Sequence, residues 1–396
     1  MPMLYAEPIE DEPPFAELPD ERPVAMPIAP MVRRPGAFGA AGRAAEWCFG
    51  VVSIFLGLSV LAAIPLGQFL ALGYLLDAAG RVARTGRIGD GFIGVRRAAR
   101  FGGVALGLTA LWLPLYYLSI QAEAARIIDP DGRIASRWTV WLTALALFGS
   151  LHGGAALLRG GRFRHFLNPF NVPWLMAKLF RGGLYRDARD RFWNVLVGLK
   201  LPYFFWLGFR GFLGAFLWLA IPLTLLGQGH RAPIVGVIGG CLLALVVIHV
   251  PFMQVRFARN NRMRAFRQFA PLRHAFRRAP LAFALALTVH LILAIPLYIL
   301  KIEVIPRDLV FLEGLMFLLL MFPARLLGGW AYARGLRRET PRLWLVRWGS
   351  RLALVPVAIA YVLVVFLSQH IGWQGIGSLY EQHAFLLPVP FVSWKG

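Results

Sequence analysis

Five polar side chains interrupt long apolar stretches of this sequence and could do chemistry there. They are Gln68, Arg210, His249, His290 and Glu313. A carboxylate in apolar surroundings could carry a proton or a cation, a guanidinium could bind an anion, and an imidazole could relay a proton or bind a metal. Placing such groups in hydrocarbon costs free energy, so these residues are the candidates for a transport or binding site.

Each candidate also has a structural interpretation. Glu313 lies about one turn inside its apolar stretch and could pair with Lys301 or Arg307 instead of acting as a relay. Arg210 could end a helix and extend its long side chain to the membrane surface.

The histidines are expected to hydrogen-bond to neighbouring helices. His249 and His290 need not lie at the same depth, which disfavours a shared metal site, because such a site would also need a carboxylate in suitable geometry. His152, which two glycines follow, is interpreted as a helix-packing residue.

No catalytic motif accompanies these residues. The sequence contains no GxxxxGK[ST] phosphate loop, no HExxH zinc helix and no GxSxG nucleophile turn. The DPDGR segment, 129–133, has two carboxylates, too few for a calcium loop, and is predicted to be a turn. Cys48 and Cys241 have no CxxC partners. We therefore expect no enzymatic activity and no cofactor or metal.

The elements that must position these residues are long apolar segments. Hydrophobic residues make up 58% of the 396 residues, whereas soluble proteins have about 45–50%. The excess is concentrated in blocks of about 20 residues, the length that crosses about 30 Å of hydrocarbon. The sequence therefore predicts an all-α, polytopic transmembrane bundle of about eight segments. The blocks are 47–76, 101–120, 138–158, 201–226, 232–252, 281–300, 309 to beyond 323, and 352–367.

A proline motif recurs in these blocks. It reads LPLYYL at 113–118, IPLTLL at 221–226 and IPLYIL at 295–300, and block one has IPLGQFL at 64–70. The repeats predict proline-kinked hairpins. They fit either simple duplication of a hairpin or broken helices that frame a substrate site.

Block one is too long for a straight span, since thirty helical residues measure about 45 Å. Pro65 interrupts it, and basic residues flank both ends. We expect a broken, partly re-entrant segment with both ends in the cytoplasm. The alternative is one tilted span with the N-terminus outside. In block two, the spacing of Gly103 and Gly107 predicts close approach of another helix.

The basic residues set the predicted orientation. The net charge is +22, and 30 of the 42 Lys and Arg residues fall in four connections, 77–100, 159–200, 253–280 and 324–351. This clustering favours cytoplasmic loops of a multi-pass protein of the cell inner membrane over a nucleic-acid-binding surface.

The connection 253–280 is the predicted lipid contact. It is expected to be either a surface helix or a solvated basic loop, and each arginine near an anionic surface contributes about 1 kcal/mol. The candidate contacts are Arg256, Arg259, Arg262, Arg264 and Arg267.

Three regions are expected along the chain. Residues 1–46 form an acidic, proline-rich tail that is predicted to be disordered, because it cannot bury enough apolar surface to fold. Residues 47–367 form the transmembrane domain. Residues 368–396 form an extracytoplasmic tail.

The segment AAIPLGQFLALGYLLDAAGRVARTGRIGDGF, 62–92, resembles an uncharacterised family of prokaryotic multi-pass membrane proteins. In that family an apolar run with a proline leads to a Gly-Tyr pair and a basic, glycine-bearing exit. The resemblance implies a membrane protein and carries no assigned activity.

Two functions from different classes fit these observations. The first is a non-enzymatic scaffold or lipid-interacting component whose partners are anionic headgroups at the basic connections, with protein partners undefined. The alternative is a small-molecule or ion transporter with its site at the broken helices. A transporter should bring Gln68, Arg210 or Glu313 to a cavity at mid-depth, whereas a scaffold should leave them at the interface or paired locally.

Overall fold

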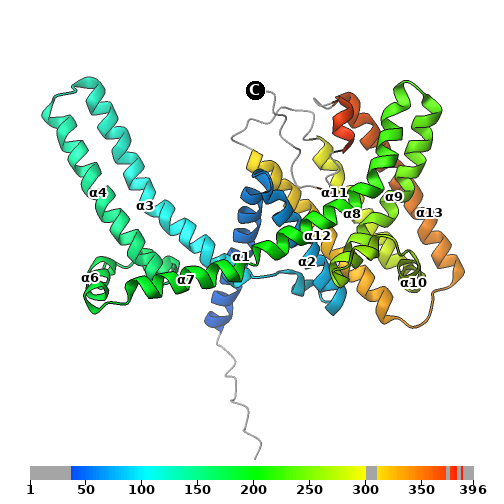
Figure 1. Ribbon diagram of the computed structural model, residues 1–396, viewed down its shortest axis with the longest axis horizontal. Coiled ribbons are helices and arrows are strands. Elements are labelled where there is room, and N and C mark those ends of the chain that lie inside the picture. Colours follow the sequence, from blue (N-terminus) through cyan, green and yellow to red (C-terminus); the bar gives the residue numbers. More distant parts are fainter. Residues whose placement is uncertain (1–36, 300–309, 372–374, 381–384, 387–396) are drawn as a thin grey trace, which may run out of the picture. The chain divides into compact units, whose positions relative to one another are not determined.

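The computed structural model describes residues 37–299, 310–371, 375–380 and 385–386. The chain divides into two compact units, Met1–Arg43 and Ala44–Gly396. Of the predicted acidic tail, residues 37–46 are helical, and residues 1–36 lie outside the described residues. Helices connected by short turns make up almost all of the described chain, which contains no strand (Figure 1).

The helices are numbered in chain order. The first seven are α1 (Ala37–Ala63), α2 (Gly67–Thr85), α3 (Val95–Ile128), α4 (Arg133–Leu158), α5 (Phe163–Phe166), α6 (Asn171–Arg181) and α7 (Leu184–Leu199). The others are α8 (Leu201–Gly227), α9 (Pro233–Asn260), α10 (Ala270–Arg278), α11 (Pro280–Ile299), α12 (Val310–Arg337) and α13 (Trp344–Ile371). Short 3-10 helices are η1 (Ile88–Gly91), η2 (Gln228–His230), η3 (Met263–Phe266) and η5 (Gly375–Tyr380).

Eight segments of the described chain are long and apolar enough to cross a membrane. They correspond one for one to the eight predicted blocks, so the all-α polytopic fold is confirmed. The candidate spans are Ala40–Ala63, Val95–Ile128, Arg133–Leu158, Leu184–His230, Pro233–Asn260, Pro280–Tyr298, Phe311–Arg337 and Trp344–Ile371. The chain is thus a multi-pass membrane protein by its architecture.

Block one is broken, as predicted. Helix α1 ends at Ala63, and α2 begins at Gly67 after a turn in which Leu66 has the left-handed φ of 67°. The first half alone qualifies as a candidate span. Helix α2 is instead buried along most of its length, against α8, α9 and α12.

The helices extend further into the basic segments than the apolar blocks indicated. Helix α9 continues to Asn260 and α12 to Arg337, so the connections 253–280 and 324–351 are largely helical. Arginine is a good helix former and is favourable near a helix C-terminus, so a helix need not end where its apolar run ends. Two other helix ends also lie outside the predicted blocks: α1 begins at Ala37, before the predicted boundary at residue 47, and α13 ends at Ile371 rather than at residue 367.

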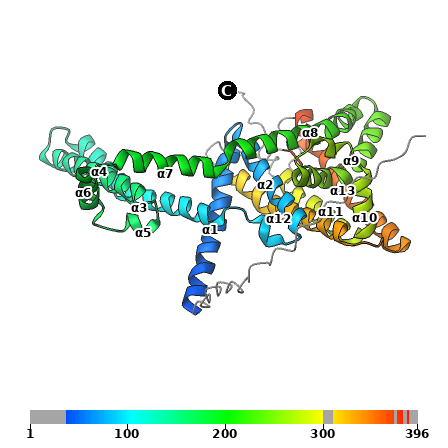
Figure 2. The same ribbon diagram turned by 60° about the horizontal axis from the view of Figure 1, so that its bottom comes forward.

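Helices α3 and α4 form an antiparallel pair that the turn at Asp129–Gly132 connects (Figure 1). Gly103 and Gly107 of α3 do have a close neighbour, but it is the single turn α5. A Cβ on Gly107 would lie 2.3 Å from the Phe166 ring. His152 of α4 holds this turn in place, with Nε2 2.8 Å from the carbonyl of Phe166. Figure 2 shows α7 leading directly into α8.

The crossing of α2 and α8 is the closest helix contact that glycines create here. A Cβ on Gly73 would lie 1.8 Å from the carbonyl oxygen of Phe204, and one on Gly208 would lie 1.9 Å from that of Phe69. The two backbones therefore touch, as small residues permit in membrane helices. This contact fixes the position of α2 against the first turns of α8.

We predict that Gly73→Ala or Gly208→Ala lowers the melting temperature of the detergent-purified protein. Overpacking of this kind costs about 1–3 kcal/mol. The matched control is Gly154→Ala in α4, where a Cβ would meet nothing within 4 Å. It should leave the melting temperature unchanged or raise it, because Ala favours a helix more than Gly does. Equal melting of Gly73→Ala and the wild type would contradict the close crossing.

Candidate functional site

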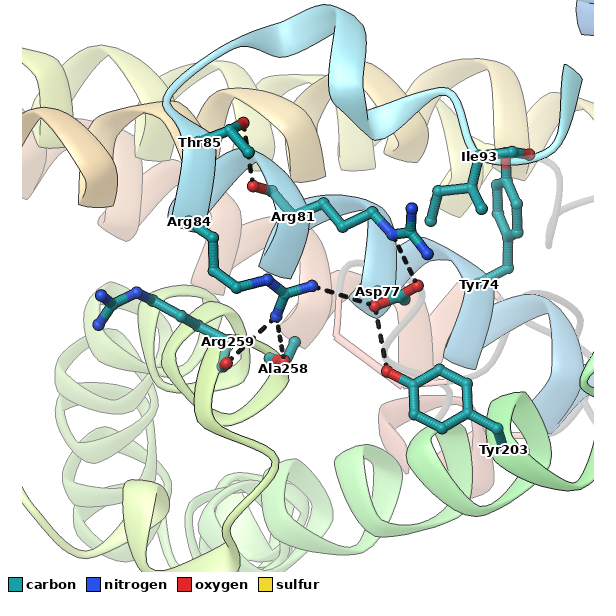
Figure 3. Close-up of polar contacts among 9 residues, drawn as sticks. All are labelled: Tyr74, Asp77, Arg81, Arg84, Thr85, Ile93, Tyr203, Ala258 and Arg259. Atoms are coloured by element: carbon teal, nitrogen blue, oxygen red, sulfur yellow. Dashed lines mark hydrogen bonds and ion pairs between the residues drawn. The ribbon is translucent and has the colours of Figure 1, made fainter. Parts of the chain in front are cut away.

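A buried carboxylate, Asp77, is the centre of a polar cluster on α2 (Figure 3). Its side chain is 3% exposed. One carboxylate oxygen accepts a hydrogen bond from Nε of Arg81 at 3.1 Å. The other accepts from Arg84 at 3.5 Å and from the Tyr203 hydroxyl at 3.1 Å. Three donors from two helices therefore converge on one charge.

The helical repeat brings two of these donors together. Residues four and seven positions after Asp77 lie on the same face of α2, so Arg81 and Arg84 reach back to the carboxylate. Tyr203 comes from the first turn of α8. Lys200, with a left-handed φ of 51°, ends α7 and turns the chain into α8 at this point.

The cluster also reaches the C-terminal end of α9. Arg84 donates to the carbonyl oxygens of Ala258 at 3.4 Å and Arg259 at 3.1 Å. These are among the last carbonyls of the helix, where a cation is favourable. One arginine therefore joins α2, through Asp77, to the end of α9.

A hydrogen bond from Tyr74 holds the segment before α3 against α2. The Tyr74 hydroxyl donates to the carbonyl of Ile93 at 3.1 Å. Helix α2 is not one of the eight candidate spans, and burial raises the pKa of the Tyr74 hydroxyl well above its ordinary value. The hydroxyl therefore stays protonated and keeps its role as a donor.

The cluster lies on the wall of a cavity of about 890 Å³, within the size range of ligand sites. Helices α1 and α2, the start of α3 and the α7–α8 junction line it. Its charged lining residues are Asp77 and four cations, Arg81, Arg84, Arg97 and Lys200, which leaves a net charge of +3. Most of the other lining residues are apolar.

The cavity is polar at one end and apolar at the other. Along α2 its lining changes from Leu70 through Tyr74 to Asp77, Arg81 and Arg84. Arg84 lies fourteen residues after Leu70, which at 1.5 Å per residue is about 21 Å along the helix axis. An amphiphilic molecule with an anionic group fits this arrangement better than a uniformly polar solute does.

The five polar residues singled out from the sequence lie on five different helices. Gln68 is buried at the start of α2, Arg210 lies in α8, His249 in α9, His290 in α11 and Glu313 in the first turn of α12. None is among the residues that line the Asp77 cavity. In the described part of the chain, no three His, Cys, Asp or Glu side chains are grouped as a metal site would require.

Several of these residues have local partners. Arg210 donates to Oδ1 of Asn261 at 2.5 Å and lies over the Trp206 and Phe257 rings. His290 is buried and stacks on Phe385 at 5.7 Å between ring centroids. The suggested partners of Glu313, Lys301 and Arg307, lie outside the described residues.

The arginines of the connection 253–280 divide into two groups. Arg256 is buried. It donates hydrogen bonds to the backbone carbonyl of Gln268 at 2.7 Å and to its side-chain oxygen at 2.6 Å, and so connects α9 to the segment before α10. Arg259 is half-buried, and its backbone carbonyl accepts from Arg84. Arg262, Arg264 and Arg267 are exposed.

Sequence reasoning missed Asp77, Arg81, Arg84 and Tyr203 as a site. A signal was present: a lone acid at the end of an apolar block, with arginines four and seven positions later on one helix face. Tyr203 gave no local signal, because it is 126 positions away from Asp77.

No protein-family model, no curated protein and no solved structure matches this sequence. The resemblance of segment 62–92 to a family of multi-pass proteins therefore stays a prediction.

We predict that Asp77→Asn destabilises the protein by about 1–3 kcal/mol, the scale of hydrogen bonds to a buried charge. Tyr203→Phe should cost less, because both arginines keep the carboxylate. The measurement is thermal unfolding in detergent. Asp190→Asn is the control, since that carboxylate is 55% exposed and pairs with exposed Arg189. A loss no larger than that of the control would contradict the central role of Asp77.

Proposed function

We propose that this protein is a non-enzymatic, lipid-interacting membrane component that binds the headgroup of an anionic lipid in the Asp77 cavity. The observation that supports it most directly is the distribution of charge in that cavity. Along α2, the carboxylate and two of the four cations lie toward one end, and apolar side chains of α1 and α2 also line the cavity. A lipid has the same order of parts, a charged head followed by apolar chains.

Asp77 has a positioning role in this proposal. It holds Arg81 and Arg84 at the cavity wall, although their side chains are 41% and 42% exposed. A headgroup phosphate then meets guanidinium groups that are already oriented, which reduces the entropy cost of binding. Arg97 is oriented in the same way, by a 2.5 Å hydrogen bond to the carbonyl of Gly198.

The local pairing of Arg210 fits this function. Arg210 is bonded to Asn261 at the C-terminal cap of α9 and does not line the Asp77 cavity. The exposed Arg262, Arg264 and Arg267 add attraction for an anionic surface, as expected for a basic segment. Under the positive-inside rule these parts face the cytoplasm, and we propose the cell inner membrane as the location.

Native mass spectrometry of the purified protein tests the proposal, with phosphatidylglycerol and phosphatidylcholine added at equal concentration. We predict selective retention of phosphatidylglycerol and about a tenfold weaker retention by a variant with Arg81, Arg97 and Lys200 all replaced by Gln. Loss of a charge-assisted contact is worth about 1.4 kcal/mol or more, which is tenfold in affinity.

The matched control replaces Arg262, Arg264 and Arg267 by Gln, which removes the same charge from an exposed segment. It should keep most of the selective retention. If it loses as much phosphatidylglycerol as the cavity variant does, the basic segment and not the cavity is the lipid contact. Equal retention of both lipids by the wild type would contradict anionic selectivity altogether.

A second candidate function is transport, and one observation in two proline-containing helices favours it. Arg325 of α12 is 1% exposed and donates to the side-chain oxygen of Gln254 in α9. Both residues closely follow a proline inside the helix, Pro323 and Pro251. An intramembrane charge of this kind is typical of substrate and ion pathways in transporters.

Osmotic swelling of proteoliposomes in salts of small anions tests this candidate. If Arg325 serves anion passage, the wild type swells faster than empty liposomes, Arg325→Gln abolishes the difference, and Arg325→Lys keeps part of it, because the charge remains. Wild-type swelling that does not exceed that of empty liposomes would exclude small-anion transport.

A further inference from the structure

A second cavity of about 610 Å³ lies among α9, α10, α11 and α13. Its wall contains two guanidinium groups, Arg273 of α10 and Arg351 of α13, together with His249 of α9. Among the residues that the structure describes, no acidic side chain lines it, and the remaining side chains are apolar, mostly Leu, Val and Phe. None of its lining residues belongs to the Asp77 cavity.

We propose that this cavity is a separate binding site for an anionic amphiphile. The anionic head, a phosphate or a carboxylate, binds between Arg273 and Arg351, and the hydrocarbon chain lies along the apolar walls of α9 and α11. The proposal does not rest on the function of the Asp77 cavity, because its residues and its contacts are different.

The arginines of this cavity differ in their ion pairing from those of the Asp77 cavity. The ion pairs found among the described residues involve Asp77, Asp187 and Asp190, and none reaches Arg273 or Arg351. Both arginines are exposed, so a ligand can reach them. In the Asp77 cavity a protein carboxylate partly neutralises the cations, whereas here an external anion is the natural counter-ion.

Aromatic contacts hold one of the two cations in place. The guanidinium carbon of Arg351 lies 5.5 Å from the ring centroid of Phe276 and 5.3 Å from that of Trp348. Cation–π contacts of this kind position a guanidinium while leaving its N–H groups available. Arg351 can therefore donate to a phosphate or carboxylate without losing its present contacts.

The order of residues along the helices gives the cavity a polar and an apolar end. The backbone N–H of Arg342 donates to the carbonyl of Arg277 at 2.9 Å, which ties the segment before α13 to the end of α10. Helix α11 begins directly after α10, so α11 and α13 start at the same end of the cavity. From that end the lining continues to Leu287 and Val355.

The apolar end is deep enough for a hydrocarbon chain. Val355 lies four residues beyond Arg351 on α13, about 6 Å along the axis. On α9 the lining residues run from Met253 back to Leu245, about 12 Å along the axis. Leu245 and Val355 are exposed, so the cavity is open at its side, where bilayer hydrocarbon would lie in a multi-pass protein.

Photo-crosslinking tests the proposal on the intact protein in dodecyl maltoside. The probe is dodecyl phosphate with a diazirine at the end of its chain. We expect labelling of the tryptic peptide 279–301, which contains α11. In the double variant Arg273→Gln/Arg351→Gln this labelling should fall about tenfold, because the head loses charge-assisted hydrogen bonds. The double variant Arg273→Lys/Arg351→Lys should keep much of it.

Two controls separate this site from the Asp77 cavity and from misfolding. Peptide 44–81 contains much of α1 and α2 and therefore reports on the Asp77 cavity. If that cavity binds the probe, this peptide should be labelled equally in both double variants. A dodecanol probe with the same diazirine tests the need for an anion. A monodisperse gel-filtration profile of each variant shows that it is folded.

Three outcomes would overturn the proposal: no labelling of 279–301 in the wild type, undiminished labelling in the Arg→Gln double variant, or equal labelling by dodecanol. Failure of the Asp77 site would instead appear as the absence of label in 44–81 alone.

Discussion

A carboxylate that is removed from water must keep its donors, and the structure around Asp77 follows from that requirement. Burial of an unpaired charge costs several kcal/mol, so Arg81, Arg84 and Tyr203 are each held where they can reach it. Because Arg84 also bonds the end of α9, one charge ties together α2, α8 and α9. The close glycine crossing of α2 and α8 brings the backbones near enough for these contacts to form.

The arrangement of long helices was predictable because hydropathy is a local property. A block of about 20 apolar residues forms a membrane helix whatever its neighbours are, so eight blocks correspond to eight candidate spans. The break in block one was also predictable, since Pro65 removes a backbone donor inside an overlong segment. Helix ends were less predictable. The charged arginines were assigned to the connections between blocks, yet α9 and α12 continue through several of them.

The candidate site was not predictable in the same way, because its contacts join distant parts of the chain. Arg325 illustrates the difficulty. Counted with its basic neighbours it belongs to a predicted connection, but in the structure it is buried and donates to Gln254, 71 positions away. Arg256 was predicted to contact lipid at the surface, and in the structure it is buried and donates two hydrogen bonds to Gln268. Whether an arginine faces water or protein depends on partners that periodicity and charge counting do not identify.

Helix α1 contributes one wall of the Asp77 cavity and joins α2 through a turn of three residues, 64–66. A wall attached in this way borders hydrocarbon on its outer side, since only a small part of the α1 span is buried within the protein. If the cavity binds a lipid as proposed, the lipid would enter past α1 from the plane of the bilayer and would never dissolve in water. Occupancy would then follow the mole fraction of that lipid in its leaflet, and the protein would respond to membrane composition rather than to any aqueous concentration.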